Sequence, residues 1–299
     1  MSDLPELVEL SNGTETLTFD GGDGVNPDDD VLLIGADGVE GWFETPDDKT
    51  VMSERGQGDG AHDVWASDIL YSARVLTLHF IVSAHDRQGV VRLLNKVRCV
   101  CAHSKVRFRL RDAGYDCYTM GRATVKASAK YARDGWLDDC TITVTCERPE
   151  ILSMEPRRYQ LLPSIESDRV GLSYGPAARG LAYPLSYGKA AVDARNVCTL
   201  TNNGSSRAYP VFTVHGPWPN GVQLTFPGLD MSLDYAQAVG NVPLVLDSRS
   251  RTASIGGLDV SRNLRQRGFP TVQPGGSLAV NLQSIGNGYV SVECHDTYM

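Results

Sequence analysis

Turn-forming residues interrupt this chain so often that they limit what it can fold into. The 299 residues include 30 glycines and 15 prolines, the two residues that most strongly punctuate regular structure. Between them lie short runs in which apolar and polar residues alternate, as they do in half-buried β-strands. The pattern therefore predicts a mainly β protein with many short strands, and the length suggests about two domains.

Residues 1–150 are predicted to form a β-rich domain with one helix. Residues 74–82 (RVLTLHFIV) alternate as a strand does. Over about residues 86–103, apolar residues recur instead at the three- and four-residue spacing of one buried helix face, and Asp86 or Ser83 can cap the start of that helix. The order of strands, helix and further strands predicts a β-sandwich with one covering helix.

Residues 151–195 show no sustained period and are interpreted as a linker or an arm. Residues 196–299 are strand-like throughout, with turn signals between short alternating runs. This spacing is typical of a β-sandwich. In its strand near the C-terminus, Leu278, Val280 and Leu282 are expected to face the core.

Charge is unevenly distributed along the chain. The formal net charge is −8, yet residues 1–63 contain 17 acidic and 2 basic residues, a net charge of −15. The remaining residues therefore carry a net charge of +7. An acidic front and a basic remainder suit head-to-tail contact between copies, although a solvated acidic loop region explains the same numbers.

The most distinctive local feature is a basic segment between residues 87 and 111 that contains no acidic residue before Asp112. Its basic residues are Arg87, Arg92, Lys96, Arg98, Lys105, Arg107, Arg109 and Arg111. In the KVRFRLR run (105–111), the basic residues share one face of a strand and Val106, Phe108 and Leu110 share the other. Three interpretations stay open: a solvated face, a contact with another protein chain, or a surface that touches phosphates.

Motifs for catalysis and metal binding are missing from the sequence. There is no HExxH, GxSxG or GxxxxGK[ST] motif, and Cys99, Cys101 and His103 have a spacing that suits a zinc site poorly. A loop starting at Asp20 fails the EF-hand pattern, which leaves only a looser calcium loop open. No catalytic, cofactor-binding or metal-binding residue is predicted, and no enzyme activity. The sequence contains seven cysteines and shows no secretory signal, so free thiols are predicted. It shows no transmembrane run, so no membrane association is predicted.

The last third of the chain contains a series of turn and strand motifs. These are Asn202–Gly204, Pro210–Gly216, Asp247, Arg251-Thr252 and Pro274–Leu278. Together they resemble the C-terminal domain of distal tail proteins of long-tailed, non-contractile bacteriophages. The order of elements in residues 1–150 is also similar to that family.

The resemblance implies a structural virion protein located in the tail and assembled in the host bacterial cytoplasm. Six copies would form a ring, with tail-tube-like N-terminal domains around a DNA channel and galectin-like C-terminal domains projecting outward. Expected partners are further copies of the chain, the tail tube protein, a tail tip or hub protein, and the tape measure protein. DNA would pass without specific binding, so we expect Arg87, Arg92, Lys105, Arg107, Arg109 and Arg111 to contact neighbouring subunits.

A carbohydrate-binding tail-tip module is the alternative. Trp218 lies between Pro217 and Pro219, and an aromatic ring offers an apolar face on which a sugar can stack. The competing interpretation is a loop tryptophan packed on its own sandwich.

Overall fold

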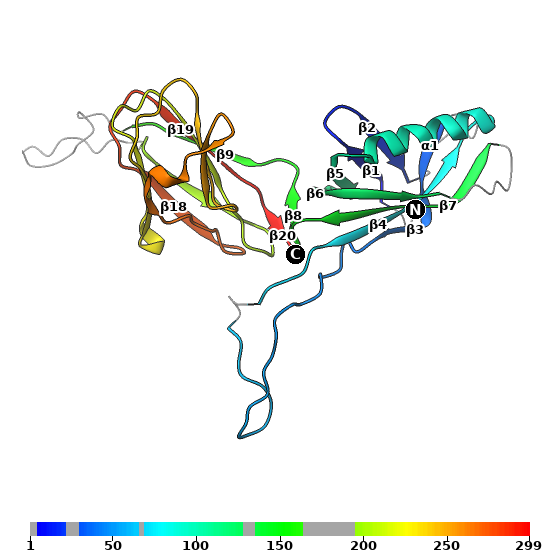
Figure 1. Ribbon diagram of the computed structural model, residues 1–299, viewed down its shortest axis with the longest axis horizontal. Coiled ribbons are helices and arrows are strands. Elements are labelled where there is room, and N and C mark those ends of the chain that lie inside the picture. The colour runs from blue at the N-terminus through cyan, green and yellow to red at the C-terminus, as the bar shows by residue number, and fades with distance from the viewer. Residues whose placement is uncertain (1–4, 22–29, 66–68, 128–134, 164–194) are drawn as a thin grey trace, which may run out of the picture. The chain divides into compact units, whose positions relative to one another are not determined.

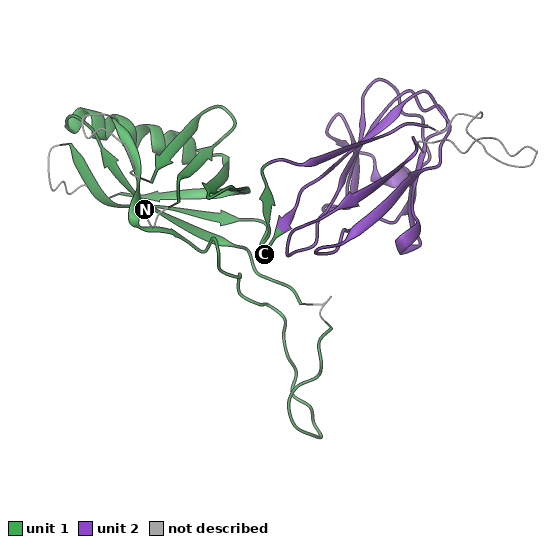
Figure 2. Ribbon diagram, turned by 180° about the vertical axis from the view of Figure 1, so that it is seen from behind, with its two compact units in different colours: residues 1–154, 298–299 green, residues 155–297 purple. Residues whose placement is uncertain are grey.

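The computed structural model describes residues 5–21, 30–65, 69–127, 135–163 and 195–299. The chain divides into two compact units, shown in Figure 2. One contains residues 1–154 with 298–299, and the other contains residues 155–297. The structure is mainly β, as the sequence predicts, and its described residues contain one α-helix.

The N-terminal unit is built on one sheet. Its strands are β1 (Leu7–Ser11), β2 (Thr16–Asp20), β3 (Val31–Glu40), β4 (Val75–Ser83), β5 (Lys105–Asp112), β6 (Tyr115–Lys126), β7 (Trp136–Cys146), β8 (Ile151–Ser153) and β20 (Thr297–Tyr298). They are hydrogen-bonded in the order β20-β8-β6-β5-β1-β2-β3-β4-β7, and β6 also pairs with β7. This second pairing closes the sheet on itself, so the two layers predicted for this domain are opposite sides of one closed sheet.

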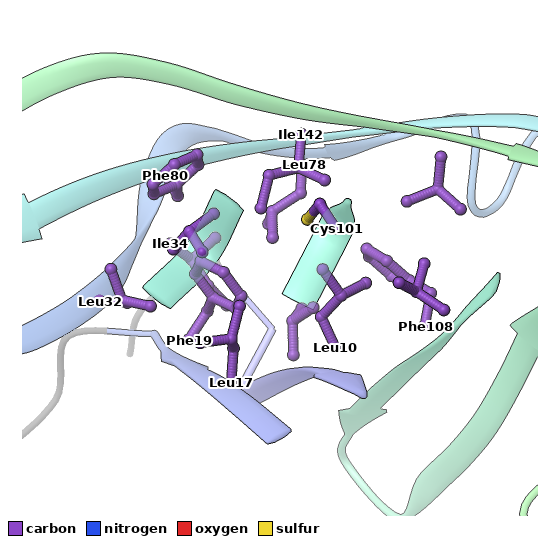
Figure 3. Close-up of a cluster of buried hydrophobic side chains, with 14 of the residues drawn as sticks. Leu10, Leu17, Phe19, Leu32, Ile34, Leu78, Phe80, Cys101, Phe108 and Ile142 are labelled. Atoms are coloured by element: carbon purple, nitrogen blue, oxygen red, sulfur yellow. The ribbon is translucent and has the colours of Figure 1, made fainter. Parts of the chain in front are cut away.

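Helix α1 (Arg87–Cys101) packs its apolar stripe into the core of this closed sheet. It begins after Asp86, whose Oδ1 accepts the backbone N–H of Gly89 at 2.7 Å, a standard N-cap. Val90, Val97 and Val100 are fully buried in the same cluster as side chains of the strands. Figure 3 shows strand residues such as Leu10, Phe19 and Phe108 gathered around the helix. The opposite side of the helix remains exposed.

The C-terminal unit consists of two sheets around one core. Its strands are β9 (Arg157–Leu161), β10 (Val197–Thr201), β11 (Val211–His215), β12 (Val222–Phe226), β13 (Met231–Tyr235), β14 (Leu244–Asp247), β15 (Thr252–Ile255), β16 (Leu258–Asp259), β17 (Leu264–Arg267), β18 (Ser277–Leu282) and β19 (Tyr289–Cys294), with short 3-10 helices at Pro227–Leu229 and Ser261–Asn263. One sheet has the order β10-β18-β12-β13-β17 and the other β16-β15-β14-β11-β19-β9. Leu278, Val280 and Leu282 of β18 face the core, as their alternation predicts.

The segment interpreted as a linker contains regular structure at its start. Strand β8 extends the N-terminal sheet, and β9 pairs with β19 at the edge of the second sandwich sheet. Residues 151–153 and 157–161 are therefore strands and not part of a structureless linker. The alternation of apolar and polar residues is weak here, because β9 reads Arg-Arg-Tyr-Gln-Leu and only Leu161 is fully buried. Residues 164–194 lie outside the described residues.

The chain end also departs from the predicted boundary. We predicted that the sandwich continues to residue 299, but residues 298–299 belong to the N-terminal unit. The ring of Tyr298 packs edge-on against that of Tyr115 in this unit, with centroids 5.8 Å apart. A strand of two residues is too short to be predicted from the alternation of apolar and polar residues.

The Asn-x-Gly turn noted in the sequence has a definite structural role. Asn202 is fully buried, and its side-chain amide donates to the carbonyl oxygens of Ser206 (2.7 Å) and Val272 (3.3 Å). Its Oδ1 accepts the backbone N–H groups of Gly204 and Thr297. A Cβ on Gly204 would lie 2.0 Å from the carbonyl oxygen of Thr297, so only glycine fits there.

Candidate inter-subunit surfaces

A long excursion of the chain leaves the N-terminal sheet between β3 and β4. We call residues 44–65 the acidic arm; Figure 1 shows it as an extended hairpin-like segment. Within the described residues, the arm forms two isolated β-bridges, Asp48 with Tyr71 and Glu54 with Ala61. Residues 51–60 are all exposed. The arm contains six acidic residues and two basic ones, a net charge of −4.

Large apolar side chains of the arm are open to solvent. Val51 is 86% exposed, Met52 67% and Trp65 80%. Such residues are usually buried, so their exposure on one segment favours a role in contacts. The arm is therefore a candidate contact surface.

Arg74, immediately before β4, fixes the base of this excursion. Its side chain is 2% exposed and donates to four carbonyl oxygens: those of Gly41 (2.6 Å), Trp42 (3.2 Å), Glu44 (2.7 Å) and Pro149 (2.7 Å). Burial lowers the pKa of the guanidinium from its ordinary value, but an arginine stays charged at neutral pH. One buried cation thus ties the root of the arm to the end of the N-terminal domain. Sequence reasoning missed Arg74, because a single arginine before a strand gives no signal of burial.

On β5, the basic residues face away from the core as predicted, and Arg109 is the centre of an ion-pair cluster. It donates to both carboxylate oxygens of Asp116 and to Glu9, each at 2.7 Å. Glu9 lies directly opposite Arg109 on β1, and Asp116 lies on β6 on the other side. The hydrogen bonds with Arg109 lower the pKa of Asp116, and those with Asp116 and Glu9 raise the pKa of Arg109.

The other basic residues of β5 are less deeply placed. Lys105 pairs with Glu147 at 2.8 Å, with both side chains more than half exposed, and Arg111 lies 4.0 Å from Glu6. Arg107 is half-buried. Much of this basic face is thus neutralised within the chain, and the contact of these residues with neighbouring subunits stays a prediction.

Helix α1 carries the rest of the basic segment on its exposed side. Arg87 and Arg92 are exposed, and Arg92 pairs with Asp30, whose pKa is lowered by that hydrogen bond. Among the residues that the structure describes, Lys96 and Arg98 form no ion pair. A shallow groove on this face is lined by Arg87, Gln88, Val91, Arg92 and Asn95. Val91 is its apolar lining residue and is 43% exposed.

Trp218 is not available as a sugar-stacking residue. Its side chain is fully buried, and its Nε1 donates to the carbonyl oxygen of His215 at 2.8 Å. Gly286 and Gly288 pack so closely on the indole that a Cβ at either position would lie within 2.6 Å of it. The predicted carbohydrate contact is wrong for this residue, because the ring faces its own sandwich.

The described residues contain no group of three or more side chains suited to hold a metal ion. Cys99 is exposed and Cys101 is buried, so the two thiols do not share a site. The remaining calcium-loop possibility involves residues 22–29, which lie outside the described residues. None of the described helices is long and apolar enough to cross a membrane.

Comparison with solved structures identifies the fold. The Dit protein of phage SPP1, described as a paradigm of the hub adsorption apparatus in phages that infect Gram-positive bacteria, superimposes with a TM-score of 0.58 and 11% identity, over 98% of this chain and 99% of that one. The chain has the fold of a phage distal tail protein.

Components of the phage P2 baseplate are similar as well. A chain from the baseplate in its activated conformation with calcium matches with a TM-score of 0.55 and 9% identity, over 98% of both chains. The strontium form gives a TM-score of 0.56 and 9% identity, over 96% of this chain and 97% of that one. No model of a protein family matches the sequence. No curated protein matches it either.

Proposed function

We propose that this chain is a structural protein of a virion tail, the distal tail hub that joins the tail tube to the tail tip. The observation that carries the proposal is the fold likeness to SPP1 Dit, which extends over 98% of this chain and so includes both units. A likeness confined to one sandwich would support much less, because sandwiches serve many unrelated functions.

In this proposal, six copies form a ring that continues the channel of the tail tube, and the galectin-like C-terminal sandwiches project outward. The partners are the tail tube protein, a tail tip or hub protein and the tape measure protein. DNA passes without specific binding. The ion pairs of β5 support this part, because Arg109 is occupied by Glu9 and Asp116 and is not available to hold phosphates.

The test is the mass of the purified full chain in solution, measured by light scattering after size exclusion, alone and with the tail tube protein. We expect a species of six times the chain mass of 32.5 kDa. A protein that remains at 32.5 kDa at high concentration and with the tube protein present would contradict the proposal. The carbohydrate-binding alternative loses its supporting residue with the burial of Trp218.

A further inference from the structure

We infer that the acidic arm of one copy docks on the exposed face of helix α1 of a second copy. This inference deepens the proposed ring and rests on it. It brings together two exposed surfaces of opposite charge. The helix face is defined by Arg87, Gln88, Val91, Arg92, Asn95, Lys96 and Arg98, all of them exposed.

Charge complementarity selects a second copy as the occupant. The helix contains four basic residues and no acidic one, a net charge of +4. The arm has a net charge of −4. Identical copies that carry both surfaces associate head to tail, and such a heterologous contact closes into a ring when the rotation between copies permits it.

Individual residues show how incomplete both surfaces are. In the described part of the chain, Lys96 and Arg98 have no ion-pair partner. Arg92 has one, Asp30, but the Arg92 side chain remains exposed in this pair. On the arm, Glu54 and Asp59 lie in the fully exposed stretch 51–60. Charged pairs across an interface steer association and fix its register, so these residues set how the two surfaces align.

Apolar contact supplies the second component. Val91 lines the groove on the helix, and the arm exposes Val51 and Met52. Docking would remove these three side chains from water, and burial of apolar surface is the main driving force in most protein association. The charged residues then form the rim around an apolar centre, as in typical interfaces.

A cysteine already present on the helix provides the test. Cys99 is exposed, whereas Cys101, Cys117, Cys140, Cys146 and Cys294 are buried and Cys198 is half-buried. The variant Met52→Cys places a second accessible thiol on the arm. Treatment of the assembled protein with a short bismaleimide is expected to give covalent dimers and higher multimers, because the two thiols lie in different copies.

Two controls make the cross-link specific. Met52→Cys combined with Cys99→Ser should abolish the multimers. Met231→Cys, an exposed methionine in the C-terminal unit, should give none. A cross-link confined to single chains would overturn the inference, since it would place the arm on its own helix.

Charge reversal tests the same contact without cross-linking. Arg98→Glu and Glu54→Lys should each raise the apparent dissociation constant of the assembly roughly tenfold, and the two changes together should restore much of the loss. Arg262→Glu, an exposed arginine on the sandwich without an ion pair in the described residues, should have no effect. Circular dichroism melting shows that each variant is folded.

The outcomes separate this inference from the proposed function. A ring of six times the chain mass that forms normally with Arg98→Glu and gives no cross-link to Cys99 overturns the inference and leaves the ring standing. A chain that never assembles, with or without the tail tube protein, contradicts both.

Discussion

The strand half and the helix half of the basic segment look alike in the sequence and differ in the structure. On β5, Arg109 is held by two carboxylates from the neighbouring strands, and its side chain is 22% exposed. On α1, Lys96 and Arg98 are exposed and have no ion-pair partner among the described residues. Arg109 lies between two strands that each supply a carboxylate, whereas on the outer face of α1 Arg92 is paired with Asp30 but Lys96 and Arg98 have no ion-pair partner among the described residues.

The comparison teaches that a run of like charges has no single role. A basic residue in a sheet takes its partner from the register of the strands beside it, and the pair then stabilises the fold. On the exposed face of α1, Lys96 and Arg98 remain available for another molecule. We therefore expect changes in β5 to affect the free energy of unfolding and changes in α1 to affect assembly.

The largest effect on stability should come from Arg109→Met. This change leaves the partly buried carboxylates of Glu9 and Asp116 without their shared cation. We expect the free energy of unfolding to fall by about 2–3 kcal/mol, as for loss of charged hydrogen bonds, measured by urea unfolding at pH 7. Arg98→Met is the matched control, and an equal loss in both variants would break the comparison.

Asp116→Asn should show a smaller effect that depends on pH. Because the pKa of Asp116 is lowered in the folded state, its ionised form stabilises the fold above the ordinary value of 3.8, and this stabilisation disappears as pH falls through the folded pKa. We expect the variant to lose about 1–2 kcal/mol at pH 7. The gap between wild type and variant should close on acidification, and a gap that persists or widens at low pH would contradict this account.

The ion pair of Lys105 with Glu147 should contribute less. Both side chains are more than half exposed, and exposed pairs typically contribute about 0.2–1 kcal/mol. A double-mutant cycle with Lys105→Met and Glu147→Gln measures the coupling energy. The coupling should shrink further at high salt, and a salt-independent value would show that the pair is better shielded than its exposure indicates.

The smallest effect should come from Lys96→Met on the helix. Since Lys96 has no ion-pair partner among the described residues, thermal and urea unfolding should change by less than about 0.5 kcal/mol. A larger loss of stability would place Lys96 with the structural residues of β5 and remove the contrast between the two halves.

Local patterns allowed much of the fold to be predicted. The alternation of residues 105–111 correctly assigned Val106, Phe108 and Leu110 to the core, and the helical spacing placed α1 close to its observed ends. The polar turn after Asp247 satisfies part of its own backbone, since Asp247 Oδ1 accepts the backbone N–H of Arg249 at 2.8 Å.

Features that depend on distant residues were not predictable in the same way. Glu9 and Arg109 are one hundred positions apart, and only the pairing of β1 with β5 brings them together. The burial of Trp218 depends on Gly286 and Gly288 in a loop far along the chain. The apolar residues of the arm can be read from the sequence, but only the folded structure shows that they are exposed to solvent.

The position of Arg74 sets an order of events during synthesis. The carbonyl oxygens of Gly41, Trp42 and Glu44 precede it in the chain, but its fourth acceptor, on Pro149, emerges from the ribosome 75 residues later. The root of the arm is therefore complete only after Pro149, which follows β7, has been made. A nascent or truncated chain that ends before Pro149 therefore has an arm whose root lacks this attachment.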